Sequence, residues 1–290
     1  MIKRKGHLLF LLPALMAVLL LTLYPSLYAV FLSFTNKSLI NPDYSLVGLK
    51  NYLELFSSGE FWSSLKVTII YVVITIFFQL TAGFLLASVT EKSRFGRKLV
   101  RTVVLISWVI PEVIVALTFK WMFIGDKYGL VNAFLLQTGL VRESIKWLSR
   151  GNLTLLVAIG MTVWRGTAFS MIMQAAGLQS VPKELYEAVE IDGANNLQRT
   201  LFVTLPLISS TLLINLIIIS IATFNVMSLV YAFSGGGPFR ATEIISIYMY
   251  KSAFKFFRFG FASSISIVMF LLNILFTLTY IKITKREFIT

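Results

Sequence analysis

Residues 181–206 read VPKELYEAVEIDGANNLQRTLFVTLP, and they separate two long apolar runs. Pro182 suits the first turn of a helix, and Leu185 and Val189 then follow one helical turn apart. Gly193 can adopt a positive φ without steric cost, so we expect a turn there. The stretch predicts a short amphipathic helix, a turn, and a second helix that continues into the next apolar run.

The chain on both sides of this stretch is dominated by apolar runs that are long enough to cross a lipid bilayer. Of its 290 residues, 57% are hydrophobic and 13% are charged, compared with about 45–50% and about 25% in soluble domains. Crossing a hydrocarbon layer takes about 18 or more apolar residues. We therefore expect an all-α membrane protein with six transmembrane helices, at residues 8–32, 65–89, 99–123, 153–178, 205–233 and 261–283.

Six spans place both termini on the same side of the membrane. Basic residues close to the span ends favour the cytoplasm for that side, notably in 3–5, 91–101 and 282–286. The first run is too long for the apolar part of a signal peptide, about 7–15 residues. We expect a multi-pass protein of the cytoplasmic membrane, with cytoplasmic termini and contacts to anionic lipid. The basic residues form no continuous patch, which argues against nucleic acid as a partner.

The chain divides by pattern into two parts. Residues 1–64 hold the first span and an amphipathic outer loop, and residues 65–285 hold the remaining spans with the cytoplasmic loop 180–206. This loop is acidic, although it lies on the side where basic residues collect. Asn195 and Gln198 also have the spacing of a capping box, which predicts the start of the second helix. An acidic helical hairpin on a basic side indicates a docking site for a partner.

The same loop carries a resemblance to a known family. Glu187-Ala188-Val189, Gly193 and Val203-Thr204-Leu205-Pro206 stand at the spacing of the loop shared by the membrane subunits of binding-protein-dependent ABC importers. That loop reads Glu-Ala-Ala, three residues, Gly, nine residues, then Ile-x-Leu-Pro, so this chain differs only by Val for Ala and Val for Ile. Stretches such as 47–52, 129–132 and 236–242 resemble the maltose-type sugar permeases.

The resemblance implies the type I ABC importer transmembrane domain, acting as a sugar or oligosaccharide permease. It implies a second homologous permease subunit, a dimer of ATPase subunits, an extracytoplasmic sugar-binding protein and a sugar substrate. By the same resemblance, the residues that couple the chain to the ATPase are Glu187, Ala188, Asp192, Gly193 and Pro206, with Glu187 facing a basic residue of the ATPase.

Nucleotide chemistry is expected on the partner. The sequence contains no G-x-x-x-x-G-K-[ST] phosphate loop, so we expect ATP and Mg²⁺ on the ATPase and no cofactor on this chain. With no cysteine and a single histidine, His7, the chain offers little for a metal centre. An intramembrane enzyme would need a convergent nucleophile, base or metal set, so we do not expect an enzyme.

A face of the fourth predicted span contains polar residues that are costly in a membrane unless they line a cavity or pair. Thr162, Arg165, Gly166 and Phe169 share this face, and we predict that they lie along the substrate path. Arg165 has two interpretations: it hydrogen-bonds sugar hydroxyls, or it pairs structurally with Glu112. Glu112 in turn either makes that pair or lies at a helix break after Pro111, lining the cavity.

In the fifth predicted span, Thr223 and Asn225 cannot both face the pore, because residues i and i+2 diverge around a helix. We favour Thr223 for the substrate path and assign Asn225 to an interhelical hydrogen bond. An importer of another solute, such as glycerol phosphate, an amino acid or phosphate, remains an alternative. An anion would favour more than one cation in the cavity, and the spans offer Arg165 and Lys120.

Overall fold

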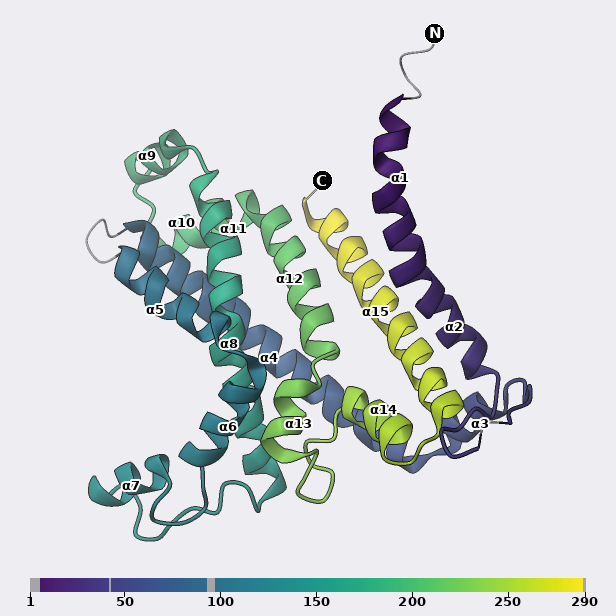
Figure 1. Ribbon diagram of the computed structural model, residues 1–290. Helices are drawn as coiled ribbons and strands as arrows, with labels where there is room; N and C mark the ends of the chain where they lie inside the picture. The colour runs from purple at the N-terminus through teal and green to yellow at the C-terminus, as the bar shows by residue number, and fades with distance from the viewer. Residues whose placement is uncertain (1–5, 42, 93–96, 289–290) are drawn as a thin grey trace. The chain divides into compact units, whose positions relative to one another are not determined.

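The computed structural model describes residues 6–41, 43–92 and 97–288, and these residues are mostly helical (Figure 1). The basic residues Lys3, Arg4, Lys5 and Arg94, which contributed to the predicted orientation, lie outside the described part. The chain divides into two compact units. The first comprises the residues up to Ser63 together with Tyr248–Leu272, and the second comprises Ser64–Ile247 together with the residues from Asn273 onward.

The first unit begins with one long apolar helical stretch. It consists of α1 (Gly6–Val18), a π-helical turn (Leu19–Leu23) and α2 (Tyr24–Ser33). Pro25 has no N–H for the turn before it, which accounts for the wider turn at this point. This stretch is long and apolar enough to cross a membrane.

A short helix, α3 (Lys50–Ser57), packs within the first unit through polar side chains. The buried Asn51 amide donates to the carbonyl oxygens of Ser33 and Thr35, each at 2.8 Å. At its exposed side, Arg258 forms an ion pair with Glu54 at 2.6 Å. The hydrogen bond from Arg258 holds the pKa of Glu54 below its ordinary value. These bonds fix α3 against the end of α2 and the turn before α15.

The second unit is a bundle around one central helix. Helix α8 (Gly151–Gln179) packs against α5, α6, α12 and α13, and α6 packs extensively on α13. The helices with residues in this unit are α4 (Gly59–Lys92), α5 (Arg97–Val109), α6 (Glu112–Met122), α7 (Leu130–Gln137), α8, α9 (Lys183–Ile191), α10 (Asn196–Arg199), α11 (Leu205–Leu207), α12 (Ser209–Phe224), α13 (Ser228–Ser234), α14 (Ile245–Phe254) and α15 (Phe259–Phe288). Of these, α4, α14 and α15 also have residues in the first unit.

Helices α4 and α8 lie in close contact because small residues face each other. A Cβ built on Gly83 would lie 2.6 Å from the Ser170 Cβ and 3.0 Å from the Met171 nitrogen, so only glycine fits there. The Gln174 amide donates to the Leu80 carbonyl oxygen at 3.1 Å and strengthens the same contact. Small residues and polar bonds are the usual means by which helices associate in a membrane, where apolar surfaces gain little by meeting.

Six spans are present if each bent helix pair is counted as one. Four described helical stretches are straight enough and apolar enough to cross a membrane, and two further pairs are bent, α5 with α6 by 98° and the segment Asn196–Leu207 with α12 by 73°. The all-α fold and the number of spans therefore agree with the prediction.

Two predicted spans are interrupted, which corrects their expected straight form. The third, at 99–123, breaks at Pro111, which removes a backbone donor and disfavours the helical conformation of the residue before it. The fifth, expected as one run over 205–233, ends as a helix at Phe224 and resumes at Ser228 in α13. The first compact unit combines the residues up to Ser63 with Tyr248–Leu272, so it is not a continuous stretch of the chain. The division into residues 1–64 and 65–285, which was based on the sequence pattern, stays a prediction.

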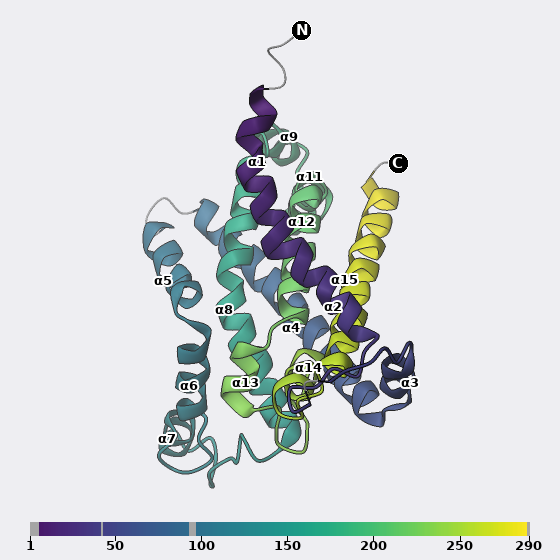
Figure 2. The same ribbon diagram turned by 45° about the vertical axis from the view of Figure 1, so that its right-hand side comes forward.

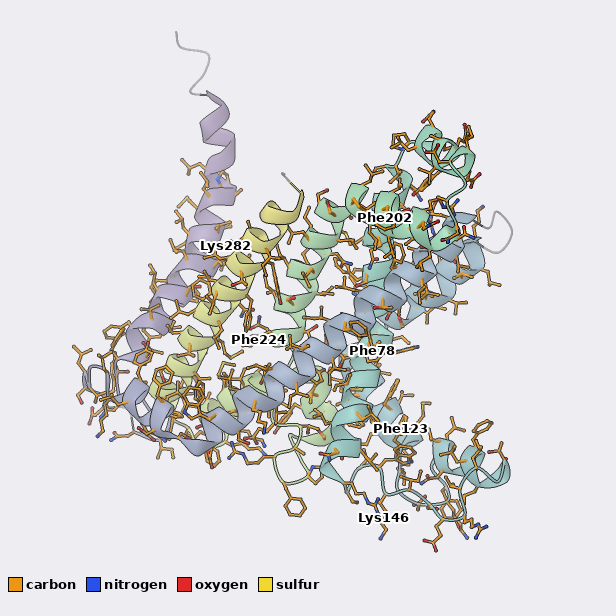
Figure 3. All side chains as sticks on the ribbon, turned by 180° about the vertical axis from the view of Figure 1, so that it is seen from behind. Phe78, Phe123, Lys146, Phe202, Phe224 and Lys282 are labelled. Atoms are coloured by element: carbon orange, nitrogen blue, oxygen red, sulfur yellow. The ribbon has the colours of Figure 1, made fainter. Side chains whose placement is uncertain are left out.

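Helices α4, α5 and α8 meet at one end of the second unit. Glu91, near the end of α4, accepts hydrogen bonds from Arg101 of α5 at 2.9 Å and from Gln179, the last residue of α8, at 2.8 Å. Helix α9 lies at this end, and α7 lies at the other (Figures 1 and 2). In Figure 3, the labelled Phe202 lies toward the α9 end, whereas Phe123 and Lys146 lie toward the α7 end.

Candidate functional site

A cavity of about 240 Å³ lies within the second unit, between α4, α5, α6, α8, α12 and α13. Its lining combines aromatic rings, aliphatic side chains and a few polar groups: Gln79, Trp108, Glu112, Thr162, Arg165, Gly166, Phe169, Ile218, Ile219, Ala222, Thr223, Val226 and Leu229. The structure thus brings all five residues predicted for the substrate path to one cavity, from two different helices. Their contact with a solute stays a prediction.

Arg165 pairs with Glu112 and still lines the cavity. The Arg165 Nη1 to Glu112 Oε1 distance is 3.3 Å, and the two side chains keep 23% and 33% of their surface exposed. The Arg165 Nε is buried and has no hydrogen-bond partner among the described residues. The two interpretations of Arg165 are therefore compatible: the ion pair is present, and the exposed part of the side chain still lines the cavity.

Glu112 connects the breaks in two helices. It is the first residue of α6, directly after Pro111, and it accepts a hydrogen bond from the hydroxyl of Ser228, the first residue of α13. Helices α6 and α13 also pack closely along their length. Both interpretations of Glu112 hold in the structure, because it forms the pair with Arg165 and also stands at a helix break on the cavity wall.

Gly166 makes room for a side chain of the neighbouring helix. A Cβ at this position would collide with the amide of Gln79. Gln79 is buried on α4, and its amide donates to the carbonyl oxygen of Thr162 at 2.9 Å. The Thr162 hydroxyl bonds the Tyr71 hydroxyl and the Ala158 carbonyl oxygen. Gly166 and Thr162 thus hold α4 and α8 together at the cavity wall.

Thr223 faces the cavity and Asn225 does not, as expected, but the predicted interhelical hydrogen bond of Asn225 is wrong. Thr223 is buried and lines the cavity. Asn225 is exposed, and its amide donates to the carbonyl oxygen of Ile221 in its own helix at 2.7 Å rather than to another helix. Asn225 is the C-cap residue of α12, and its backbone N–H also donates to the Ile221 carbonyl oxygen, so both of its bonds stay within the last turn of this helix.

Three residues of this region were missed by sequence reasoning. Gln79 is a polar residue in an apolar span, which is a signal that would have singled it out. Trp108 packs beside Phe169, with tilted rings whose centroids are 6.2 Å apart. No sequence pattern distinguishes a tryptophan that lines a cavity from one that packs against another helix. Ser228 lies after a helix break that the hydropathy pattern does not show. Trp164, by contrast, packs on Phe119 and is not part of the lining.

The loop 180–206 forms the helix, turn and second helix that the sequence predicts. Helix α9 follows Pro182, which is its N-cap residue, and Gly193 has φ +76 in the turn. Asn195 and Gln198 form a complete capping box with two bonds of 2.9 Å. A π-helical turn, Thr200–Thr204, then precedes α11, which contains Pro206.

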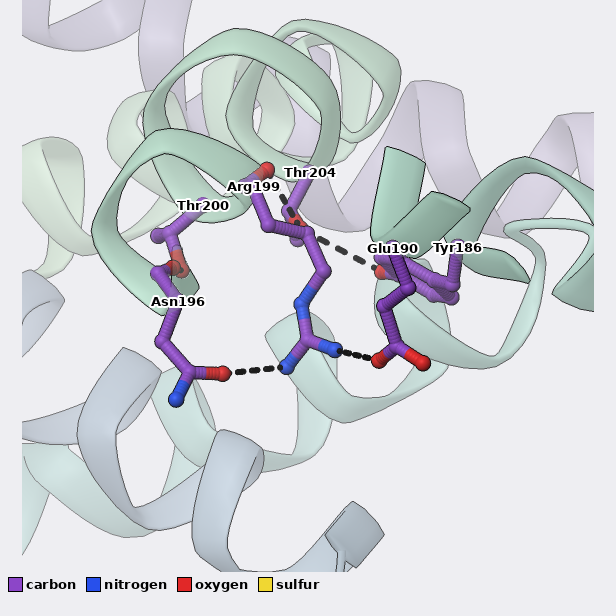
Figure 4. Close-up of polar contacts among 6 residues, drawn as sticks. All are labelled: Tyr186, Glu190, Asn196, Arg199, Thr200 and Thr204. Atoms are coloured by element: carbon purple, nitrogen blue, oxygen red, sulfur yellow. Dashed lines mark hydrogen bonds and ion pairs between the residues drawn. The ribbon is translucent and has the colours of Figure 1, made fainter. Parts of the chain in front are cut away.

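An ion pair fixes α9 against α10 across the turn (Figure 4). Arg199 bonds Glu190 at 2.8 Å and Asn196 at 3.0 Å, and its guanidinium group lies 5.4 Å from the centre of the Tyr186 ring. Only 18% of the Arg199 side chain is exposed, whereas Glu190 keeps 64% of its surface exposed, so Arg199 is the partner held inside the hairpin. The hairpin therefore has a defined internal geometry.

The outer face of this hairpin is acidic and apolar and lacks partners within the described chain. Glu187 and Asp192 are exposed and form no ion pair with a described residue. Several large apolar side chains of the same hairpin are also exposed: Leu185, Ile191, Leu197, Leu201 and Phe202. Exposed apolar side chains around unpaired carboxylates are typical of a protein interface.

The described residues contain no group of three or more His, Cys, Asp or Glu side chains close enough to hold a metal ion. The ionisable groups on the cavity wall are Glu112 and Arg165, which neutralise each other. The cavity can therefore surround a small polar solute with aromatic faces and hydrogen-bonding groups.

Comparisons with known proteins place the chain in a family of transporters. The family described as "Binding-protein-dependent transport system inner membrane component" matches residues 79–287. The trehalose/maltose transport system permease protein MalF of Thermococcus litoralis is 34% identical over 280 residues, which cover 96% of this chain and 92% of that protein. The lactose transport system permease protein LacF of Rhizobium radiobacter is 31% identical over 269 residues, which cover 91% of this chain and 89% of that protein.

The fold is also that of a solved importer. A chain of the bacterial alginate ABC transporter, in complex with alginate pentasaccharide-bound periplasmic protein, superposes with a TM-score of 0.82 at 24% identity, covering 98% of this chain and 96% of that one. The family match spans most of the chain and includes the loop and every residue of the cavity wall. The chain therefore belongs to the binding-protein-dependent transport system inner membrane components, and it is a transporter subunit with the type I ABC importer fold.

Proposed function

We propose that this chain is one of two homologous permease subunits of an ABC importer that moves a sugar or oligosaccharide across the cytoplasmic membrane. An extracytoplasmic binding protein delivers the saccharide, and a dimer of ATPase subunits binds ATP and Mg²⁺ and drives transport. Both termini and the loop 180–206 lie on the cytoplasmic side. This orientation is supported by the basic residues at the span ends and by the hydrogen bond between Glu91 at the end of α4 and Gln179 at the end of α8, which brings these two helix ends together.

The observation that carries the proposal is the cavity. Trp108 and Phe169 offer aromatic faces on which a sugar ring can stack, and Gln79, Thr162 and Thr223 lie on the same wall. Ligand sites combine an apolar lining with a few placed polar groups in this way. Three relatives that are at least 30% identical support a saccharide, since their names state transport of trehalose or maltose, lactose, and sulfoquinovosyl glycerol.

The hairpin supports the coupling role. Its carboxylates Glu187 and Asp192 are exposed, as are several large apolar side chains of the same hairpin, and Gly193 lies in the turn between its helices. The pair between Glu190 and Arg199 keeps the hairpin rigid, so a movement of the ATPase is passed to α11 and α12. Rocking of helices around a central cavity would then expose it to alternate sides of the membrane.

The test is transport by the complete importer. The chain is coexpressed with a second permease, an ATPase and a binding protein encoded beside it, and reconstituted in proteoliposomes. We expect saturable, ATP-dependent uptake of at least one labelled saccharide, and no uptake when the phosphate-loop lysine of the ATPase is replaced. Uptake of labelled glycerol phosphate, phosphate or an amino acid, with none of any saccharide, would contradict the proposal.

A further inference from the structure

We infer that this cavity selects neutral saccharides against acidic ones, because Glu112 cancels the charge of Arg165 before a solute arrives. The inference rests on the proposed function and narrows its substrate class. It concerns the two residues of the cavity wall that carry a full charge, and these two lie 3.3 Å apart.

The charge of the cavity wall is balanced. Arg165 is the cation among the lining residues, and Glu112 is the anion. Lys120, the other basic residue of the spans considered for anion binding, is exposed in the last turn of α6 and does not line the cavity. An acidic saccharide would therefore meet no unpaired positive charge among the described residues that line the cavity.

An acidic saccharide would also face a direct penalty. To pair with Arg165, its carboxylate must approach Glu112 or displace it, and two carboxylates that share one cation repel each other. Displacing Glu112 would leave this carboxylate without its ion pair in a partly buried position, which is costly. Glu112 is further held by the hydroxyl of Ser228, so it is not free to move away.

A neutral saccharide meets the same pair without this penalty. The Arg165 side chain lines the cavity and keeps 23% of its surface exposed, so a sugar hydroxyl can accept from its guanidinium N–H groups. Arg165 thus offers a hydrogen bond while its net charge stays neutralised. Aromatic stacking on Trp108 and Phe169 does not depend on a solute charge. An importer with this fold exists for the acidic polysaccharide alginate, so the fold alone does not set the charge preference.

The experiment compares matched sugars on the complete importer in lipid nanodiscs. Saturation-transfer NMR detects weak binding, and the probes are the methyl glycosides of glucose, galactose and mannose beside those of the corresponding uronic acids. For wild type we expect the neutral member of at least one pair to bind about tenfold more tightly or better, corresponding to the loss of one charge-assisted interaction. In the Glu112→Gln variant, Arg165 is unpaired, so the acidic member should gain about tenfold.

Glu143→Gln is the matched control. It makes the same change at an exposed carboxylate between α7 and α8 that does not line the cavity, so the ratio of neutral to acidic binding should stay as in wild type. Copurification with the ATPase checks that each variant is folded and assembled. If the Glu112→Gln importer does not assemble, the ratio of neutral to acidic glycoside binding in wild type still tests the inference.

Two results would overturn the inference alone: tighter or equal binding of the uronic acid glycosides by wild type, or an unchanged ratio in an assembled Glu112→Gln importer. In both cases the importer still binds saccharides, so the proposed function stands. If no glycoside of either charge binds and no saccharide is taken up, the proposed function fails and the inference fails with it.

Discussion

At the residue scale, the cavity depends on a few polar side chains whose partners are now defined. Gln79 supports the wall through Thr162, Arg165 and Glu112 pair, and Thr223 stands opposite on another helix. Thr223 is buried without a hydrogen bond from its hydroxyl to any other described residue. Removing this hydroxyl therefore breaks no hydrogen bond among the described residues, but it removes a polar group from the cavity wall that a solute would contact.

We predict that Thr223→Val weakens substrate affinity without loss of assembly. Valine keeps the shape of threonine and removes one hydroxyl, so the loss should be about 0.5–1.5 kcal/mol, a several-fold increase in the KM of uptake. The matched control is Thr279→Val, because Thr279 is exposed on α15 and bonds only the Leu275 carbonyl oxygen of its own helix. A KM that is equal in the two variants would show that Thr223 does not contact the solute.

The sequence was sufficient to predict which candidate residues share a helical face, but not which of them contact each other. The spacing of Thr162, Arg165, Gly166 and Phe169 follows from the helical period, so their common face was visible in the sequence. Whether Arg165 meets Glu112 depends on how two distant segments pack, and no periodicity contains this information. The failed assignment of Asn225 has the same origin, because a helix end that is not visible in an apolar run decides which bond the side chain makes.

At the element scale, local signals were sufficient for the hairpin and insufficient for the bends. Helix α9, the turn at Gly193 and the capping box depend on neighbours within a few residues, and these were predicted. Pro111 indicates a break, but the 98° between α5 and α6 is set by the packing of α6 on α13. The same limit applies to the separate helix α13, whose apolar residues continue the pattern of the span before it.

We predict that Gly83→Ala destabilises the contact between α4 and α8. The new Cβ would meet the Ser170 Cβ and the backbone of α8, which cannot move as a side chain can. Overpacking of this kind costs about 1–3 kcal/mol, so the midpoint of thermal inactivation of the purified importer should fall. Gly160→Ala is the control on α8, since a Cβ there meets nothing within 4 Å, and its midpoint should stay equal or rise. Equal midpoints in both variants would contradict the close packing.

At the scale of the whole molecule, transport requires that two distant parts of the second unit act together. The cavity lies within the helix bundle, and the hairpin lies at one end of it, next to the ends of α4 and α8 (Figure 1). A change in the hairpin should therefore affect the use of ATP and leave the cavity intact. This separation allows coupling and substrate binding to be tested independently.

We predict that Glu187→Lys removes energy coupling while saccharide binding persists. Glu187 is exposed on α9 of the hairpin, and a basic partner on the ATPase would be left facing a like charge. Breaking such a pair by altering one partner costs about 3–5 kcal/mol when the pair is buried in the complex. Copurification of the ATPase and substrate-stimulated ATP hydrolysis should both fall, whereas binding of the transported saccharide by NMR should not.

The control is Glu143→Lys, the same charge change on an exposed residue between α7 and α8, at the other end of the unit. It should leave ATPase copurification unchanged. If Glu187→Lys retains wild-type copurification and hydrolysis, the ATPase contacts another part of the chain, and the segment from Glu91 to Arg101 is the next one to test.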